Sequence, residues 1–97
     1  MATAKKFGVA GVSTLNGRTK IRWANDAMRI KILVKNGHTD VELINLPREM
    51  SKREIALYMQ EIGFMKDNVD VQAAIRYVLR KNPAEVVDSA QDSLVTA

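Results

Sequence analysis

In the first half of the chain, hydrophobic and polar residues alternate around two Asn-Gly dipeptides, Asn16-Gly17 and Asn36-Gly37. An Asn-Gly pair favours the two-residue turn whose backbone twist matches that of two antiparallel strands. A register centred on Asn16-Gly17 pairs Thr14 with Thr19, Val12 with Ile21 and Ala10 with Trp23 on one face, and Leu15 with Arg18, Ser13 with Lys20 and Gly11 with Arg22 on the other. This separation predicts a β-hairpin with one apolar and one basic face.

The second Asn-Gly pair predicts a second hairpin. A register centred there pairs Val34 with Thr39, Ile32 with Val41 and Ile30 with Leu43 on an apolar face, and Lys31 with Glu42, Leu33 with Asp40 and Arg29 with Ile44 on the other. The alternative is a helix from Ala27 to Asn36, with Asp26 as its N-cap and Gly37 at its end. The alternation of β-branched with polar residues favours the strand.

The second half of the chain changes to a helical period. Pro47 has no amide hydrogen to donate, so we expect it to end the strand region. Ser51 and Glu54 form a capping-box pattern, and Gly63 follows the last apolar position, which predicts a helix over residues 52–62. A second helix is expected over residues 69–81, with one apolar stripe: Val71, Ala74, Ile75, Val78 and Leu79.

These elements predict an α+β fold, in which two consecutive β-hairpins form an antiparallel sheet and two C-terminal α-helices pack on one face. The 97 residues suit one domain. We expect that domain to span residues 1–82, with residues 1–8 as a flexible basic arm. Residues 83–97 are expected to form an acidic tail, and a short third helix beginning near Pro83 is the alternative.

The composition narrows the class of protein. The chain has no cysteine and only one histidine, His38, at the tip of the second predicted hairpin, where we expect it to be solvated. No phosphate-binding glycine motif and no dense acidic loop is present, so we expect no catalytic residues, no metal and no cofactor. No apolar stretch approaches the roughly 18 to 20 residues that cross a bilayer, so a cytoplasmic protein without membrane contact is expected.

The net charge of +4 is unevenly distributed along the chain. Residues 1–36 carry eight basic side chains and one acidic one, whereas residues 83–97 carry three acidic side chains and no basic one. If both helices cover the apolar face of the sheet, the basic residues share its uncovered face and the arm. The candidate binding residues are Arg18, Lys20, Arg22, Arg29, Lys31, Lys5 and Lys6.

Such a basic surface favours an acidic partner. The leading hypothesis is a small non-catalytic protein that binds the phosphate backbone of DNA or RNA. An alternative is a regulatory or inhibitory adaptor that binds an acidic protein surface, through the same basic face or through Leu33, Ile44 and Leu46. A third is a homo-oligomer that assembles through an unpaired hairpin edge.

Overall fold

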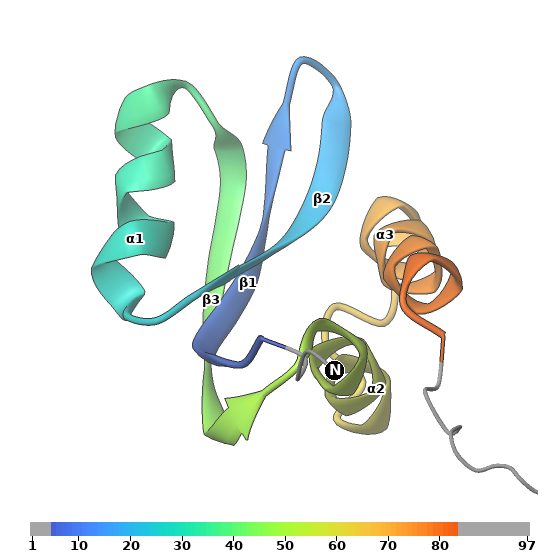
Figure 1. Ribbon diagram of the computed structural model, residues 1–97. Helices are drawn as coiled ribbons and strands as arrows, with labels where there is room; N and C mark the ends of the chain where they lie inside the picture. Colours follow the sequence, from blue (N-terminus) through green and yellow to red (C-terminus); the bar gives the residue numbers. More distant parts are fainter. Residues whose placement is uncertain (1–4, 84–97) are drawn as a thin grey trace, which may run out of the picture.

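Three strands and four helical segments make up residues 5–83, the part of the chain that the structure, a computed structural model, describes. In chain order they are β1 (Phe7–Leu15), β2 (Arg18–Ala24), α1 (Ala27–Lys31), the 3-10 helix η1 (Ile32–Asn36), β3 (Thr39–Met50), α2 (Lys52–Glu61) and α3 (Val69–Lys81). The antiparallel sheet has the order β2-β1-β3. The segment α1–η1 lies on one side of this sheet and α2 and α3 on the other (Figure 1). The α+β class is thus confirmed, with three strands in place of the four expected.

The first hairpin has the predicted register. Val12 lies opposite Ile21 and Ala10 opposite Trp23, with Leu15 paired to Arg18 at the turn. Asn16 and Gly17 both have positive φ, 53° and 77°, as a two-residue turn of this kind requires. The Thr14 and Thr19 hydroxyl oxygens are 2.7 Å apart across the ladder, so a hydrogen bond joins the side chains next to the turn.

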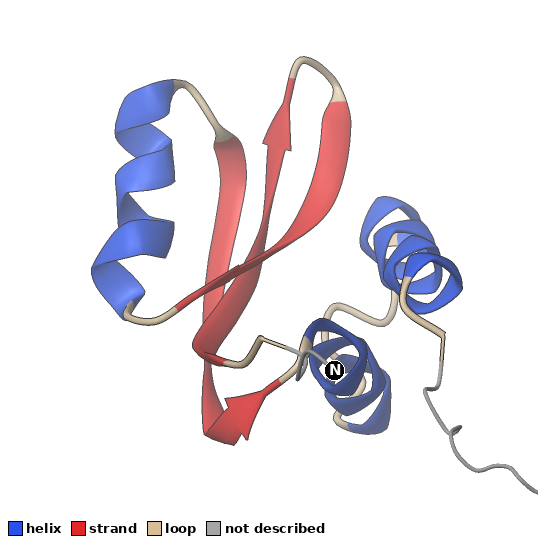
Figure 2. Ribbon diagram, viewed as in Figure 1, coloured by secondary structure: helices blue, strands red, loops and turns tan. Residues whose placement is uncertain are grey.

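The second hairpin is a wrong prediction, because residues 27–36 are helical (Figure 2). The Asp26 carboxylate accepts a hydrogen bond from the Arg29 amide at 3.2 Å, which caps the start of α1. Gly37, at φ 89°, takes the left-handed conformation that ends η1. Arg29 and Lys31 therefore lie on a helix and not on a strand.

Strand β3 instead pairs with the free edge of β1, and it continues through Pro47 to Met50, where a break was expected. Phe7 lies opposite Met50 but Val9 lies opposite Asn45, so four residues of β3, including Pro47, span one residue of β1. Because β3 is an edge strand and this stretch is bulged, Pro47 lies where the regular pairing of the two strands is interrupted. The strand region therefore does not end at the proline.

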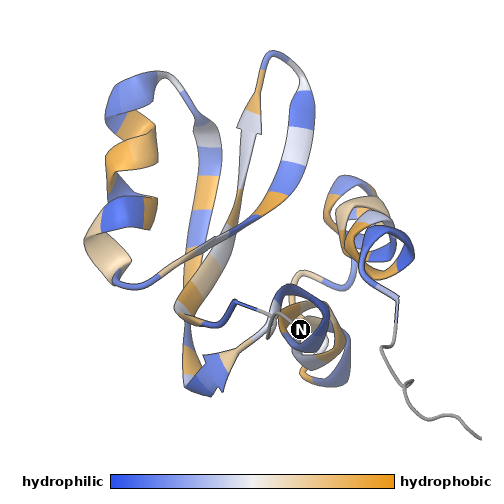
Figure 3. Cartoon of the chain, in the orientation of Figure 1, coloured by the Kyte–Doolittle hydropathy of each residue, from blue (hydrophilic) through white to orange (hydrophobic). Residues whose placement is uncertain are grey.

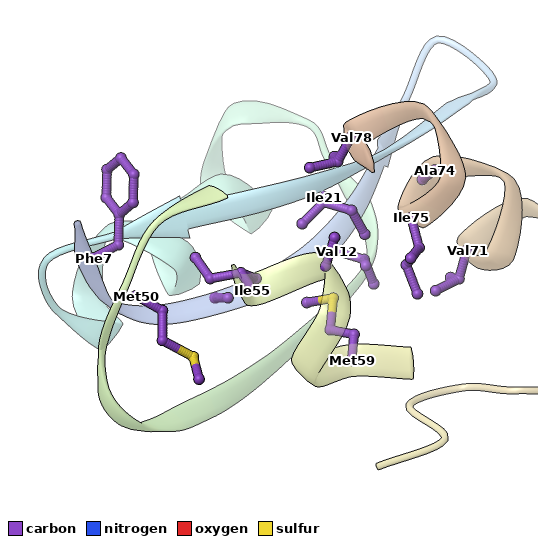
Figure 4. Packing of buried hydrophobic residues seen from close by; sticks show 12 residues of the cluster. Phe7, Val12, Ile21, Met50, Ile55, Met59, Val71, Ala74, Ile75 and Val78 are labelled. Carbon is purple, nitrogen blue, oxygen red and sulfur yellow. The ribbon is translucent and has the colours of Figure 1, made fainter. Parts of the chain in front are cut away.

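The main core lies between the sheet and the two C-terminal helices (Figure 4). Val12 and Ile21 from the sheet meet Ile55 and Met59 of α2, and α3 contributes the predicted stripe, with Leu79 partly buried: Val71, Ala74, Ile75 and Val78. The capping box of α2 is present, with the Ser51 amide donating to Glu54 Oε1 at 2.9 Å and the Glu54 amide donating to Ser51 Oγ at 3.3 Å. Both helix predictions are confirmed, α2 ending at Glu61.

A second, smaller core lies on the opposite face of the sheet. Ile30 of α1 packs there against Val9 and Ala24, and the partly buried side chains around them are Leu33, Val41 and Leu43. The expectation that this face is uncovered is therefore wrong, because α1 and η1 occupy part of it. Leu33 lies in this second core, and Ile44 and Leu46 pack against the main one, so none of the three is an exposed apolar remnant.

The ends of the chain bear on two further expectations. Strand β1 already begins at Phe7, which is buried, so residues 7 and 8 belong to the sheet rather than to the arm. The acidic tail and its alternative, a third helix, lie outside the described residues beyond Pro83. Among the helices of residues 5–83, none is both long and apolar enough to cross a membrane.

Candidate functional site

An open cleft of about 1200 Å³ follows the outer edge of β2, between α1–η1 on one side and α3 on the other. Its position follows from the fold, because β2 has a neighbouring strand only on the β1 side. Polar and apolar residues alternate along β2 (Figure 3). The cleft collects cations from the N-terminal segment, β2, α1 and α3: Lys5, Arg18, Lys20, Arg22, Arg29 and Arg80. One carboxylate, that of Asp70, accompanies these six cations.

Five of the seven candidate residues therefore line one cleft, although the surface is not the flat sheet face that the sequence suggested. Arg18, Lys20 and Arg22 reach it from alternate positions of β2, Arg29 from α1, and Lys5 from the segment before β1. The other two do not line it. Lys31 is exposed on α1, and Lys6 lines a second cleft near the start of α2.

Arg22 is the most constrained of these cations. Its Nε donates a hydrogen bond of 2.7 Å to the hydroxyl oxygen of Ser13, which is fully buried in β1. Burial lowers the pKa of Arg22 below its ordinary value, but an arginine side chain stays protonated in a protein. The guanidinium is thus a fixed positive charge, and the hydrogen bond to Ser13 holds it in place.

The same hydroxyl makes a second hydrogen bond, 2.7 Å from Ser13 Oγ to His38 Nδ1. The sequence predicted a solvated histidine here, which is wrong, because His38 is partly buried and bonded. The Ser13 hydroxyl therefore accepts from Arg22 and shares a second hydrogen bond with the His38 imidazole. A serine beside a histidine is also the pairing of a nucleophile and its base. Ser13 is 0% exposed, however, and its other hydrogen-bond partner is the cation of Arg22. This arrangement favours a structural link between β1, β2 and the start of β3.

The second cleft, of about 770 Å³, adjoins the start of α2. It too is rich in cations, with Glu54 as the one carboxylate: Lys5, Lys6, Lys52, Arg53 and Lys81. Lys5 lines both clefts, so the two basic surfaces meet at this residue. Lys52 Nζ lies 4.8 Å from the centre of the Trp23 ring, which keeps that cation close to β2.

The structure also brings an aromatic side chain to the cations. Tyr77 of α3 is 50% exposed and lines the β2 cleft. Trp23, expected to face inward, is partly buried, and its ring centre is 6.0 Å from that of Phe7. Tyr77 is therefore the exposed aromatic ring of the β2 cleft.

Several residues of this surface could not be found by sequence reasoning. Tyr77, Arg80 and Lys81 belong to the helix predicted over residues 69–81, but they lie outside its predicted apolar stripe. The helical period places Tyr77 and Arg80, three residues apart, on one face outside the buried stripe, but nothing in the sequence places that face beside β2. Lys52 and Arg53 follow the capping residue Ser51, and nothing in their spacing indicates the second cleft.

The described residues contain no group of three or more metal-ligating side chains. No family model, no curated protein and no solved structure matches the chain. The function is therefore argued from this surface.

Proposed function

We propose that the chain is a small non-catalytic nucleic-acid-binding protein whose β2 cleft holds the phosphate backbone. The observation that carries the proposal is the convergence of six cations and one carboxylate on one open cleft. These cations come from residues far apart in the sequence, so the fold itself gathers them. That the chain is not an enzyme stays a prediction of the sequence.

The physical basis is the release of counterions. A nucleic acid holds a layer of condensed cations, and each phosphate that a lysine or arginine neutralises frees some of them. The affinity therefore falls as salt rises, with a slope of roughly 0.9 per contact for a duplex and 0.7 for a single strand. Lys6 extends the basic surface beyond the β2 cleft, and Lys5 lines both clefts.

The experiment compares two triple variants with the same change in net charge. One replaces three cleft cations by glutamine, Arg18→Gln, Lys20→Gln and Arg29→Gln. Arg22 is retained because it also holds Ser13. The matched control replaces three exposed lysines that do not line the cleft, Lys31→Gln, Lys35→Gln and Lys66→Gln.

Fluorescence anisotropy with a labelled duplex and a labelled single strand, each at several salt concentrations, gives the affinity and the slope. We expect the cleft variant to lose binding to all sequences alike and to flatten the salt slope by roughly two to three units. The control should keep most of the affinity. Equal losses in both variants would mean that net charge alone binds the ligand, and no wild-type binding tighter than roughly 0.1 mM at physiological salt would refute the proposal.

One observation favours a second candidate, the binding of an acidic, extended protein segment. β2 is an edge strand, and the cleft runs along the edge that does not face β1. An extended peptide can add to such an edge through backbone hydrogen bonds, and the cations would then select acidic side chains. Capture of the same stoichiometric protein from lysate before and after nuclease treatment, with no affinity for nucleic acid, would favour this candidate.

A further inference from the structure

We propose that the preferred ligand is single-stranded, with one unpaired base stacked on Tyr77 where the two basic clefts approach each other. This inference rests on the proposed function and names its substrate class. The observation behind it is the position of an exposed aromatic ring among cations of both clefts.

Tyr77 lies beside a cation of each basic surface. Arg80, which lines the β2 cleft, has its guanidinium carbon 5.8 Å from the centre of the Tyr77 ring. Lys81, which lines the second cleft, has its Nζ at the same distance of 5.8 Å. A strand that runs from Arg80 in the β2 cleft to Lys81 in the second cleft therefore passes the ring.

A single strand offers what this surface can bind and a duplex does not. Its bases are free to leave the stack, and each base has a flat face that can lie on an aromatic ring. In a duplex the base faces are already stacked on their neighbours, so only phosphates and groove edges remain accessible. Tyr77 adds affinity only for the unpaired form.

The other partly accessible aromatic ring is less suited to this role. The Trp23 ring packs beside Phe7, with the two ring centres 6.0 Å apart. Trp23 is partly buried, whereas half of Tyr77 is exposed. The structure therefore assigns the stacking position to Tyr77.

The test uses the whole chain with Tyr77→Ala, Tyr77→Phe and, as a control on the same helix, Val69→Ala. Val69 is exposed and lines neither cleft. The probes are a fluorescent single strand of about 15 thymidylates, which spans the usual site size, and a duplex of the same length. Thermal unfolding of each variant confirms that the fold is retained.

We expect Tyr77→Ala to weaken single-strand binding about tenfold, which corresponds to about 1.4 kcal/mol, and to leave duplex binding unchanged. The salt slope should stay the same, because no charge is removed. Tyr77→Phe should retain the affinity, since the ring and not the hydroxyl stacks, and Val69→Ala should match the wild type.

The inference fails if wild type binds the two probes equally, or if Tyr77→Ala weakens both alike. In either case binding through the basic cleft survives as a function without a base-stacking position. If neither probe binds at all, the proposed function itself fails, and a captured acidic protein partner would replace it. The outcomes are thus separable in one set of titrations.

Discussion

Because residues 27–36 are helical, we expect replacement by alanine to destabilise the protein much more at Ile30 than at Ile32. Ile30 is 2% exposed and lies at the centre of the second core, whereas Ile32 begins η1 and is 46% exposed. In the hairpin that the sequence suggested, both would lie on the same apolar strand face. Replacing each by alanine therefore distinguishes the two conformations.

The magnitudes follow from burial. Ile→Ala removes three carbons, and at roughly 0.8 kcal/mol for each buried CH₂ the transfer contribution for Ile30 is about 2.4 kcal/mol. The cavity left between α1 and the sheet adds to this, so we expect Ile30→Ala to lower the free energy of unfolding by about 3 kcal/mol. For Ile32 the transfer contribution is about halved and no closed cavity forms. The higher helix propensity of alanine offsets part of the remaining cost, so we expect Ile32→Ala to lower the free energy of unfolding by less than about 1 kcal/mol.

Urea unfolding followed by fluorescence of Trp23, the one tryptophan of the chain, measures both changes. The midpoints should shift strongly for Ile30→Ala and weakly for Ile32→Ala, with similar slopes. Equal and large losses of unfolding free energy for the two variants would refute the helix and support the strand. Leu33→Ala is a further check, because Leu33 packs in the second core here but would face away from the apolar side in the hairpin.

Two further predictions concern the sheet and the start of α2. A Cβ at Gly11 would overlap the carbonyl oxygen of Glu42 and lie 3.3 Å from the Leu43 Cα. Gly11→Ala should therefore lower the free energy of unfolding in urea by about 3 kcal/mol. A loss below roughly 1 kcal/mol would contradict the β1–β3 register. The hydrogen bond from the Ser51 amide, with lesser effects of Lys6 and Arg48, lowers the pKa of Glu54 below 4.5. The Glu54 carboxylate therefore stabilises the fold above pH 4.5, and this stabilisation disappears as the pH falls through the lowered pKa. Glu54→Gln should therefore cost about 0.5 kcal/mol at pH 7 and progressively less as the pH falls through the lowered pKa, and a cost that does not change with pH would exclude the charge effect.

Local sequence signals predicted the first hairpin and both C-terminal helices. At Asn16-Gly17 the turn chemistry and the alternation of faces agree, and the register is the one expected. At Ser51 the cap precedes an apolar stripe of helical period, and its side chain makes the capping hydrogen bond to the Glu54 amide. The helix predicted over residues 69–81 was recognised by its stripe, and in the structure Asn68 caps it by accepting from the Val71 amide. Where local preference and burial pattern agree, tertiary packing has no competing solution to select.

Residues 27–36 show where local signals conflict. The alternation of Ile30, Ile32 and Val34 with polar residues is typical of a strand, but Asp26 and Gly37 provide the start and stop of a helix. The deciding contact is long-range. Once β3 pairs with β1, the segment from β2 to β3 crosses one face of the sheet, and a helix buries Ile30 and Leu33 there together.

The sequence predicted most of the cations of the candidate site, but not the shape of the surface that they line. The excess of cations before residue 36 identified five residues of the β2 cleft, because strand alternation places Arg18, Lys20 and Arg22 on one side. Arg29 reached the cleft through a helix that was not expected. Tyr77 and Arg80 are 53 and 56 residues beyond Ala24, the end of β2, and only the packing of α3 beside β2 brings them to the cleft.

The central claim, that the β2 cleft is the ligand-binding surface, is tested most directly by mapping amide chemical shifts of the isotopically labelled protein during titration with the thymidylate strand. The largest changes should fall on residues 18–24 and 77–81, with little change at Ile32, Val34 and Lys35 on the exposed side of η1. Changes confined to η1, or spread evenly over the lysines of the whole surface, would contradict the claim.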